Sequence, residues 1–307
     1  MKEFIDELSK RFNVKRKDLL EKDIILQKIL LDLSKDEFFS NNLAFKGGTC
    51  LIKCYLGYYR FSEDIDFTWI DQSIFKDKSQ KETRKIISDL KDKIGELLVD
   101  IARKRDLDFI LDKNNKDYIE FGGGNKFVTF KIWFDSVVLE HRSFIKIQIN
   151  FVEDVIFDVS KKVVNCLLSD KEDKELEILF EDDYKDYITY ISYWTYDVKE
   201  ILCEKVRAIL TRRGIKARDF VDVFFMTKHY RISVKDVKKE IVDKTKYMLR
   251  MYKKYRSNFE EKKKLVEVPN FFKWSNEKEL LLVKINEEEF IVFVKNFTKI
   301  LQYISKF

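Results

Sequence analysis

The chain has 307 residues, of which 45% are hydrophobic and 15% aromatic, and this composition excludes a protein that is disordered throughout. Its 60 Lys and Arg residues against 54 Asp and Glu residues leave a formal net charge of +6. No apolar run approaches the ~18 residues that a membrane span needs, and acids near the start argue against a signal peptide. We therefore expect a cytoplasmic protein with no membrane partner.

The cysteines and histidines narrow the chemistry further. Four scattered cysteines are too few for the scaffold of a disulfide-rich protein in a chain of this length. Only Cys50 and Cys54 are closely spaced, and no second pair completes a structural zinc site. Neither His141 nor His229 lies in a motif typical of hydrolase triads. We expect neither structural zinc nor a histidine-dependent hydrolase.

The first half of the chain reads as helices followed by a mixed sheet. Apolar residues at helical spacing fill the first forty residues. A strand, a break at Gly47-Gly48 and a helix to about Leu56 come next, and a charged helix is predicted over residues 79–105. The predicted strands cover residues 43–45, 64–70, 118–121, 126–134 and 144–152, with a hairpin turn at glycines 122–124.

The second half is almost wholly helical. One helix is predicted from about Asp197 to Arg213, ending before Gly214, and another begins near Lys216. Residues 228–264 hold 14 Lys or Arg and 5 acids, a net charge of +9, so a basic surface is expected there.

A shift in composition separates the two halves. Residues 170–186 hold nine acids and three lysines, a net charge of −6. We predict an α+β fold with a mixed sheet flanked by helices in residues 1–190. A helical domain that carries the basic surface follows in residues 191–307.

Two carboxylates share one face of the strand predicted over residues 64–70. Because side chains alternate along a strand, Asp64 and Asp66 lie opposite to the apolar side chains between and after them. Such a pair can converge on Mg²⁺, which prefers a few carboxylates together with phosphate oxygens and water. Asp64 and Asp66 are therefore the candidate ligands for Mg²⁺ or Mn²⁺ in a phosphoryl-type transfer.

The turn before this strand offers a phosphate site. Gly47 and Gly48 let the backbone approach a ligand closely, and the following helix presents free N–H groups to an anion. Thr49 is expected to cap that helix and to offer a hydroxyl to phosphate, while Lys46 and Arg60 add positive charge. A glycine turn or an Asp-x-Asp pair alone is commonplace, but their order in one segment favours a nucleotide site.

Both features lie in FKGGTCLIKCYLGYYRFSEDIDF, from Phe45 to Phe67. This segment resembles the signature of the AbiEii/AbiGii toxin family, a branch of the polymerase-beta-like nucleotidyltransferase superfamily. The matching residues are Lys46-Gly47-Gly48-Thr49 and Arg60-Phe61-Ser62-Glu63-Asp64-Ile65-Asp66. The resemblance implies a nucleotidyltransferase that binds a nucleoside triphosphate with these residues, Ser62 included, and metal with the two aspartates. It also implies that residues 1–190 form a nucleotidyltransferase-type mixed sheet and that the helical domain of residues 191–307 completes the active site.

A second block, EILCEKVRAILTRRGIKARDFVD, also resembles the family. On its first helix Lys205 and Arg212 share a positive face, and on the next helix Asp219 and Asp222 lie one turn apart. The resemblance implies that Lys205 contacts the nucleotide phosphates and that Asp219 or Asp222 positions the nucleotide or the lysine. Without the resemblance, surface salt bridges are the commoner role of such charges.

One position departs from the superfamily pattern. The third carboxylate normally comes from a later strand, and the aligned position here holds Gln148. A glutamine can ligate a metal through its carbonyl oxygen, but it cannot accept a proton from an attacking hydroxyl. Glu153, Asp154 or a carboxylate of the helical domain would then be the general base, or turnover is weak.

Basic and aromatic residues interleave in KYMLRMYKKYRSNFEEKKK. Arg250, Lys253, Lys254 and Arg256 alternate with tyrosines, a pattern that suits an RNA backbone and unpaired bases. A lysine-rich helix is just as often a solvated face. Family members act on RNA, tRNA included, or on protein acceptors.

We therefore expect a Mg²⁺-dependent nucleotidyltransferase toxin that moves a nucleoside monophosphate from a nucleoside triphosphate to a macromolecule, with tRNA favoured. A cognate antitoxin would check it in a toxin–antitoxin or abortive-infection system of phage defence. Two alternatives remain open: a catalytically weak regulatory protein that binds nucleotide and RNA, and an antibiotic-type nucleotidyltransferase with a small-molecule acceptor. The large basic helical half argues against the second.

Overall fold

The computed structural model describes residues 1–169, 173–268, 271–274 and 276–307. The described chain separates into two compact units. The first unit consists of Met1–Glu153 and Val159–Thr195, and the second consists of Asp154–Asp158 and Tyr196–Phe307. Residues 170–172, at the start of the acidic stretch noted in the sequence, lie outside the described residues.

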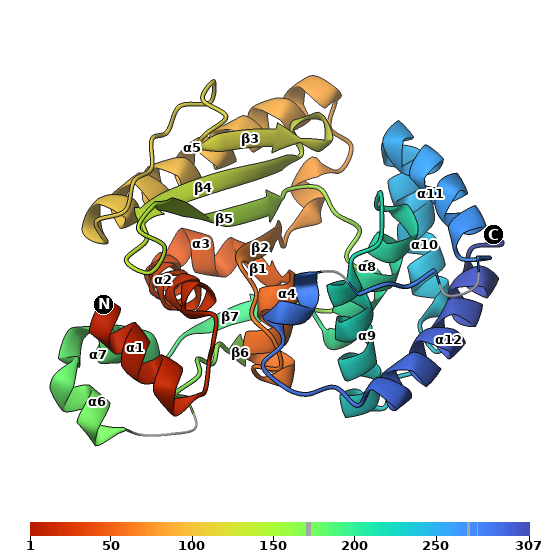
Figure 1. The fold of residues 1–307 in the computed structure, drawn as a ribbon. Coiled ribbons are helices and arrows are strands. Elements are labelled where there is room, and N and C mark those ends of the chain that lie inside the picture. The colour runs from red at the N-terminus through yellow and green to blue at the C-terminus, as the bar shows by residue number, and fades with distance from the viewer. Residues whose placement is uncertain (170–172, 269–270, 275) are drawn as a thin grey trace. The chain divides into compact units, whose positions relative to one another are not determined.

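A seven-stranded mixed sheet lies at the centre of the first unit, with the strand order β3-β4-β5-β2-β1-β7-β6 (Figure 1). The strands are β1 (Leu43–Lys46), β2 (Asp64–Trp69), β3 (Ile119–Gly122), β4 (Phe127–Asp135), β5 (Arg142–Asn150), β6 (Ser160–Val163) and β7 (Ser192–Thr195). β2 pairs in parallel with β5 and β1 with β7, and the other neighbouring pairs are antiparallel.

The mixed sheet expected from the sequence is confirmed, and β3 and β4 form the hairpin predicted at the glycine turn. The sequence pattern does not reveal β6 and β7. β6 contains two adjacent lysines and is mostly exposed, and β7 has only two buried residues, so neither has the apolar pattern from which a strand is predicted.

The two faces of the sheet differ in polarity. Ile65 and Phe67 of β2 are fully buried, and Phe67 contacts Phe39 with ring centroids 4.8 Å apart. The residues that alternate with them, Asp64 and Asp66, are half-buried. The alternation predicted for this strand is therefore confirmed, with the two carboxylates on the face opposite to the apolar core.

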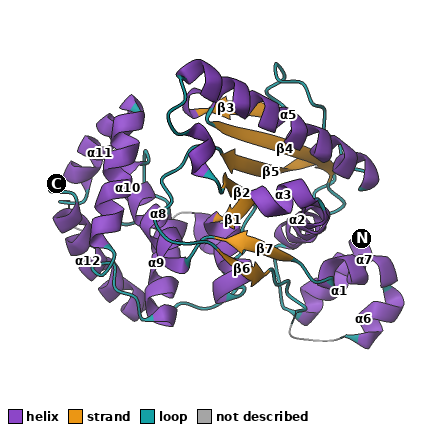
Figure 2. Ribbon diagram, turned by 180° about the vertical axis from the view of Figure 1, so that it is seen from behind, coloured by secondary structure: helices purple, strands orange, loops and turns teal. Residues whose placement is uncertain are grey.

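Helices cover the apolar face of the sheet. Figure 2 shows α2, α3 and α5 on the side of the sheet that is nearer the viewer there. The helices of the first unit are α1 (Lys2–Arg11), α2 (Lys17–Lys35), α3 (Glu37–Asn42), α4 (Gly47–Cys50), α5 (Gln80–Lys104), α6 (Lys174–Leu179) and α7 (Glu181–Ile188).

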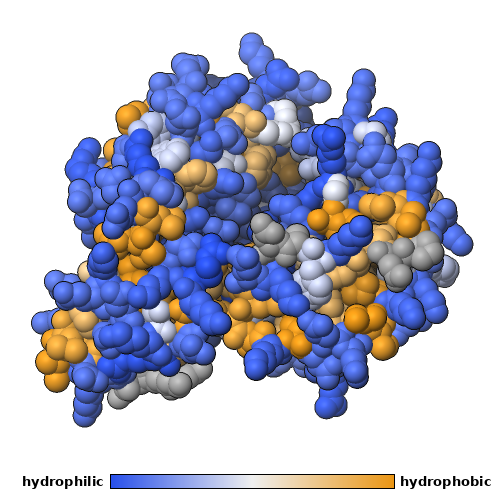
Figure 3. All heavy atoms as spheres, viewed as in Figure 1, coloured by the Kyte–Doolittle hydropathy of each residue, from blue (hydrophilic) through white to orange (hydrophobic). Residues whose placement is uncertain are grey.

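Some apolar side chains of α6 are exposed, and apolar atoms are visible there in Figure 3. Ile178 and Leu179 of this helix are 81% and 59% exposed.

The second unit is helical. Its helices are α8 (Val198–Thr211), α9 (Ala217–Tyr230), α10 (Lys238–Met251), α11 (Lys253–Leu265) and α12 (Glu287–Ile304). None of the helices in the described ranges combines the length and the apolarity that crossing a bilayer requires.

A buried carboxylate ties a distant segment into this unit. Glu200 on α8 is fully buried and forms an ion pair with Lys244 on α10. It also accepts hydrogen bonds from the backbone N–H groups of Ile156 (2.9 Å) and Phe157 (2.8 Å). These bonds satisfy a charge that would be costly to bury alone, and they hold the segment Asp154–Asp158 in the second unit.

Candidate active site

Gly47 and Gly48 lie where the chain leaves β1 and passes close to two polar side chains. Gly47 has a φ of +77°, a conformation that other residues rarely adopt. A Cβ atom at Gly47 would lie 2.3 Å from Asp66 Oδ2, and one at Gly48 would lie 2.8 Å from Arg60 Nη2. Glycine is therefore required at position 47 by its φ and its contact with Asp66, whereas Gly48 lies against the end of the Arg60 side chain.

Thr49 is buried and connects the two blocks of the motif. Its Oγ1 is hydrogen-bonded to Ser62 Oγ (2.8 Å) and to the carbonyl oxygen of Asp64. The N-cap position of α4 belongs to Lys46, and no side chain caps the helix. The prediction that Thr49 caps this helix is wrong, because Thr49 lies within the helical turn and bonds to the start of β2 instead.

Strand pairing places the candidate residues in one row across the sheet. Lys46 on β1 pairs with Asp66 on β2, and Asp66 pairs with Gln148 on β5. Because the side chains of paired residues share a face, Asp66 lies between Lys46 and Gln148. Gln148 Nε2 in turn lies 3.4 Å from Thr129 Oγ1 on β4.

Lys46 and Arg60 are both buried, at 6% and 2% exposure. Lys46 Nζ lies 3.2 Å from Glu153 Oε2, and the same oxygen accepts a hydrogen bond from Asn150 Nδ2 (2.9 Å). Arg60 Nη1 donates to the carbonyl oxygen of Phe61 (2.7 Å). Lys46 and Glu153 are 107 positions apart, so no motif spacing in the sequence indicates their pairing.

The acidic pair on β2 fits a divalent cation that also binds phosphate. Among the described residues, the half-buried Asp64 forms no ion pair. No group of three or more His, Cys, Asp or Glu side chains in the described ranges could hold a metal ion. Two carboxylates nevertheless suit Mg²⁺, which takes one or two of them together with substrate phosphates and water.

A buried ion-pair network links α8 and α9 within the second unit. Lys205 Nζ lies 3.1 Å from Asp219 Oδ1 and 2.6 Å from Asp222 Oδ2, and Arg212 Nη1 lies 2.7 Å from Asp219 Oδ2. Asp219 and Asp222 are 2% and 0% exposed. The network is therefore not the solvated set of salt bridges that commonly accounts for such charges.

The protonation of two buried groups follows from their surroundings. Burial opposes the ionisation of Asp219, but the charges of Lys205 and Arg212 outweigh it and hold the pKa of Asp219 below its ordinary value. In the first unit, burial above all raises the pKa of the Cys50 thiol well beyond its ordinary value. Cys50 therefore remains a protonated thiol, which is a poor metal ligand.

The sequence profile of one protein family, described as the nucleotidyl transferase AbiEii toxin of type IV toxin–antitoxin systems, matches residues 28–279. This span contains both the glycine turn with its two aspartates and the Lys205 network. The chain belongs to the AbiEii family. It is thus a nucleotidyltransferase and a toxin of a toxin–antitoxin system, with a nucleoside triphosphate as substrate and an antitoxin as partner.

Two crystal structures cover nearly the whole of this AbiEii-family chain at low identity. JHP933 from Helicobacter pylori is 17% identical, with 94% of this chain and 95% of that chain covered and a TM-score of 0.40. A protein provisionally named as a nucleotidyltransferase from H. pylori is also 17% identical, with 94% and 97% covered and a TM-score of 0.39. No curated protein matches the sequence.

The basic stretch of this AbiEii-family chain lies on α10 and α11. Arg250, Lys253, Lys254 and Arg256 are all exposed. Arg256 Nε also donates a hydrogen bond to the carbonyl oxygen of Leu249 (2.7 Å). Arg256 therefore stabilises the end of α10 in addition to its surface charge, whereas the other three side chains contribute charge alone or with a neighbouring ring.

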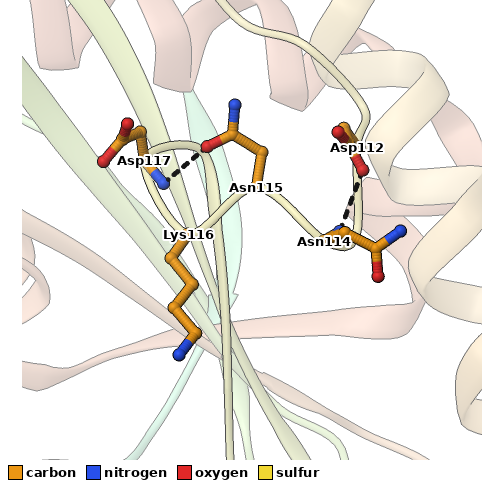
Figure 4. Close-up of a pocket in the computed structure, with 5 residues that line it drawn as sticks. All are labelled: Asp112, Asn114, Asn115, Lys116 and Asp117. Atoms are coloured by element: carbon orange, nitrogen blue, oxygen red, sulfur yellow. Dashed lines mark hydrogen bonds between the residues drawn. The ribbon is translucent and has the colours of Figure 1, made fainter.

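An open depression on the loop between α5 and β3 does not coincide with the AbiEii-type motif residues. Five residues line it (Figure 4): Asp112, Asn114, Asn115, Lys116 and Asp117. The backbone N–H groups of Asn114 and Asp117 donate to Asp112 Oδ1 and Asn115 Oδ1, each at 2.9 Å. These bonds close local turns, and none of the residues predicted for the nucleotide or metal site takes part.

Proposed function

We propose that the protein transfers a nucleoside monophosphate from a nucleoside triphosphate to a hydroxyl group of RNA, with tRNA as the favoured acceptor. The transfer depends on Mg²⁺ or Mn²⁺ and takes place in the cytoplasm, as toxin–antitoxin growth control or as abortive infection in phage defence. The observation that carries the proposal is the placement of Asp64 and Asp66 on one face of β2, with the glycine turn packed against Asp66.

Asp64 and Asp66 would hold the divalent cation in this proposal. When bound, the cation neutralises charge on the phosphate oxygens and helps to orient the triphosphate. Gly47 and Gly48 allow the backbone to approach the phosphates without steric obstruction. The side chain of Asp66 is itself held by the turn, because Gly47 lies directly against its carboxylate.

Four polar residues around the turn keep it in place and give it positive charge. Thr49 and Ser62 bond to one another and fix the turn to the start of β2. Lys46 and Arg60 place two cationic side chains in the same segment. We propose that all four belong to the nucleotide-binding site, with Lys46 and Arg60 offsetting the charge of the triphosphate.

The transfer requires a base. The acceptor oxygen bonds to the α-phosphorus, the bond to pyrophosphate breaks, and the hydroxyl proton must go to an acceptor. Gln148 lies beside Asp66 but cannot take that proton. Glu153 is the base that we propose, because this buried carboxylate contacts Lys46, and Lys46 pairs with Asp66 across the sheet.

The helical unit contributes Lys205 to nucleotide binding in this proposal. Asp219 and Asp222 both lie within 3.1 Å of Lys205 Nζ, so they fix the position of the ammonium group. A held ammonium group neutralises phosphate charge without having to be ordered at the moment of binding. Asp219 and Asp222 would therefore act through Lys205, and Lys205 would contact the nucleotide.

The exposed cations of α10 and α11 are the proposed contact for the RNA backbone. Arg250, Lys253 and Lys254 are exposed on two successive helices, and clustered cations of this kind attract phosphate in a salt-dependent manner. Arg256 adds to the same charge while it bonds to the backbone. The contribution is expected to be independent of RNA sequence.

A second candidate function is favoured by the glutamine beside Asp66. With Gln148 in place of a third acid, the chain could bind nucleotide and RNA with little turnover and act as a regulator. This alternative predicts Mg²⁺-dependent nucleotide binding that is lost in Asp64→Ala, without any labelled product.

The transfer assay separates the two functions. The protein is incubated with each α-labelled nucleoside triphosphate, Mg²⁺ and total tRNA, and label on RNA is measured. We expect label with the wild type, and a loss of at least about 100-fold in Asp64→Asn and Asp66→Asn. Asp89→Asn, an exposed aspartate on α5, is the matched control and should transfer normally. Absence of label, or an active Asp66→Asn variant, contradicts the proposal.

A growth assay tests the toxin role in cells. Expression of the wild type should arrest growth, and Asp64→Ala should restore it while the protein accumulates to the same level. Growth arrest by Asp64→Ala would show that toxicity does not depend on transfer.

A further inference from the structure

Two aromatic rings and three cations form a platform on β4 and β5, defined here as Lys131, Trp133, Arg142, Phe144 and Lys146. Trp133 and Phe144 are paired across the strands, with ring centroids 4.7 Å apart. Lys146 Nζ lies 5.5 Å and Lys131 Nζ 5.9 Å from the centre of the Phe144 ring, and Arg142 lies 5.0 Å from that of Trp133. The rings thus lie beside three cationic groups, two of which are ion-paired.

The platform faces away from the apolar core of the sheet. Trp133, Phe144 and Lys146 are all partly exposed, whereas Ile132 and Ile145, which alternate with them, are 2% and 0% exposed. In Figure 1, β3 and β4 lie in front of α5, and Figure 2 shows α5 in front of them from behind. α5 therefore covers the opposite face.

The platform is continuous with the two aspartates of β2. Asp64 pairs with Lys146 on β5, and Lys146 pairs with Lys131 on β4. Paired residues on neighbouring strands lie about 5 Å apart and share a face. Phe144 is the next residue of β5 on that face, about 7 Å further along the strand. A chain bound at Asp64 would reach the Phe144 ring within one or two nucleotides.

We infer that this platform binds the unpaired end of the RNA acceptor, with a base stacked against Phe144 and Trp133 and a phosphate held by Lys146. The inference rests on the proposed transfer to RNA and adds the place where the acceptor end binds. The inference also specifies that the acceptor end is single-stranded, with bases that are free to stack.

The charge of the platform favours RNA over a peptide. Lys146 forms no ion pair with any described residue, so its charge is available to an anion. Lys131 and Arg142 are paired with Glu120 and Asp108, which holds both cations beside the rings. Rings flanked by cations provide stacking together with phosphate attraction, the combination that proteins use for single-stranded nucleic acid.

The loop before β3 holds two side chains of the platform in place through hydrogen bonds. Trp133 Nε1 donates to the carbonyl oxygen of Asp117 (2.8 Å), and Lys131 Nζ donates to that of Lys116 (2.9 Å). Both side chains are therefore held in position before any ligand binds, which reduces the ordering cost of binding.

Binding of a fluorescein-labelled, unstructured oligoribonucleotide of about ten residues to the full chain tests the inference by fluorescence anisotropy. Phe144→Leu keeps an apolar side chain but removes the ring, and Lys146→Gln keeps the stem but removes the charge. We expect Phe144→Leu to weaken binding about 10-fold and Lys146→Gln to weaken it about threefold. The same oligonucleotide in a duplex should bind without dependence on Phe144.

Lys161 and Trp194 provide a matched control at the other end of the sheet. Lys161 Nζ lies 5.3 Å from the Trp194 ring on β6 and β7, so Lys161→Gln removes an equivalent cation above an aromatic ring. Binding should be unchanged in that variant. As a second readout, RNA should quench tryptophan fluorescence in the wild type and should quench it less in Trp133→Phe.

The inference is overturned if the wild type, Phe144→Leu and Lys146→Gln bind the oligonucleotide with equal affinity. It is also overturned if these substitutions weaken only the binding of peptides. The outcome is independent of catalysis, because the binding assay contains no nucleoside triphosphate and therefore no transfer takes place in it. If the wild type transfers nothing but RNA binding still depends on Phe144, the proposed function fails and the platform remains an RNA site.

Discussion

Gly47 and Asp66 are packed so closely that a Cβ atom on the glycine would lie 2.3 Å from Asp66 Oδ2. The two residues come from the turn after β1 and from β2, and the register that pairs Lys46 with Asp66 brings them together. The conformation of the turn and the position of a proposed metal ligand are therefore linked. A change at either residue has to be accommodated by the other.

The first prediction concerns Gly47→Ala. The substitution places an alanine at φ +77°, which costs about 1–2 kcal/mol, and it also displaces the Asp66 carboxylate. Because misplacement of a reacting group by about 1 Å can cost about 100-fold in rate, we expect nucleotide transfer to fall by about that factor. Urea unfolding and the transfer assay measure the two effects separately.

Gly57→Ala is the matched control for this prediction. Gly57 has a φ of +73° and no atom within 4 Å of the position that a Cβ would take. Its substitution therefore introduces backbone strain at a similar φ without displacing a neighbour. It should lose stability and keep its transfer activity. Equal loss of activity in both variants would mean that strain, and not the contact with Asp66, is responsible.

The sequence predicted the residues of this turn but not the contacts that hold it. Alternation along β2 fixes which side chains share a face, so the placement of Asp64 and Asp66 followed from local pattern alone. The assignment of Thr49 as a helix cap was wrong because the side chain found a partner in β2, 15 positions away. Local sequence propensity does not indicate which of two hydrogen-bond partners a side chain will take.

Contacts that depend on strand order could not be derived from the residue pattern itself, and only the family resemblance pointed to the strand that holds Gln148. The pairing of Lys46 with Glu153 and of Asp64 with Lys146 requires β1, β2 and β5 to be neighbours. Neither spacing nor periodicity states that order. The strands β6 and β7 were missed for a related reason, since their pairing with each other and of β7 with β1 defines them, and their own residues carry little apolar pattern.

The second prediction concerns the buried hydroxyl of Thr49. Thr49→Val keeps the shape of the side chain but removes the bonds to Ser62 and to the Asp64 carbonyl oxygen. Leaving these polar groups unpaired should lower the free energy of unfolding by about 1–3 kcal/mol. Thr49→Ser retains the hydroxyl and should lose less. Urea denaturation compares the three proteins, and a Thr49→Val variant as stable as the wild type contradicts the structural role.

The third prediction concerns the missing third acid. Gln148→Glu places a carboxylate beside Asp66, and an added negative ligand strengthens divalent cation binding. We expect the Mg²⁺ concentration for half-maximal nucleotide transfer to fall by about 10-fold. Gln148→Leu, which offers no ligand, should raise it. A Mg²⁺ requirement that is the same in all three proteins would show that residue 148 does not face the cation.

The last prediction is a pH dependence that arises from Asp219. Because its pKa is lowered in the folded protein, its ion pairs stabilise the fold fully above its ordinary pKa, and this stability is lost as the pH falls through the lowered value. Asp219→Asn leaves the largely buried Lys205 and the partly exposed Arg212 with less compensation and should cost about 3 kcal/mol near neutral pH. The difference from the wild type should shrink below about pH 4.

Urea unfolding at neutral and acidic pH measures this effect, with Glu287→Gln as the control. Glu287 also has a lowered pKa, through its hydrogen bond with Lys278, but both side chains of that pair are more than half exposed. Solvent screens such a pair, so its loss should change stability little at either pH. A gap between Asp219→Asn and the wild type that stays constant with pH would show that the stability of α8 against α9 comes from packing and not from the charge of Asp219.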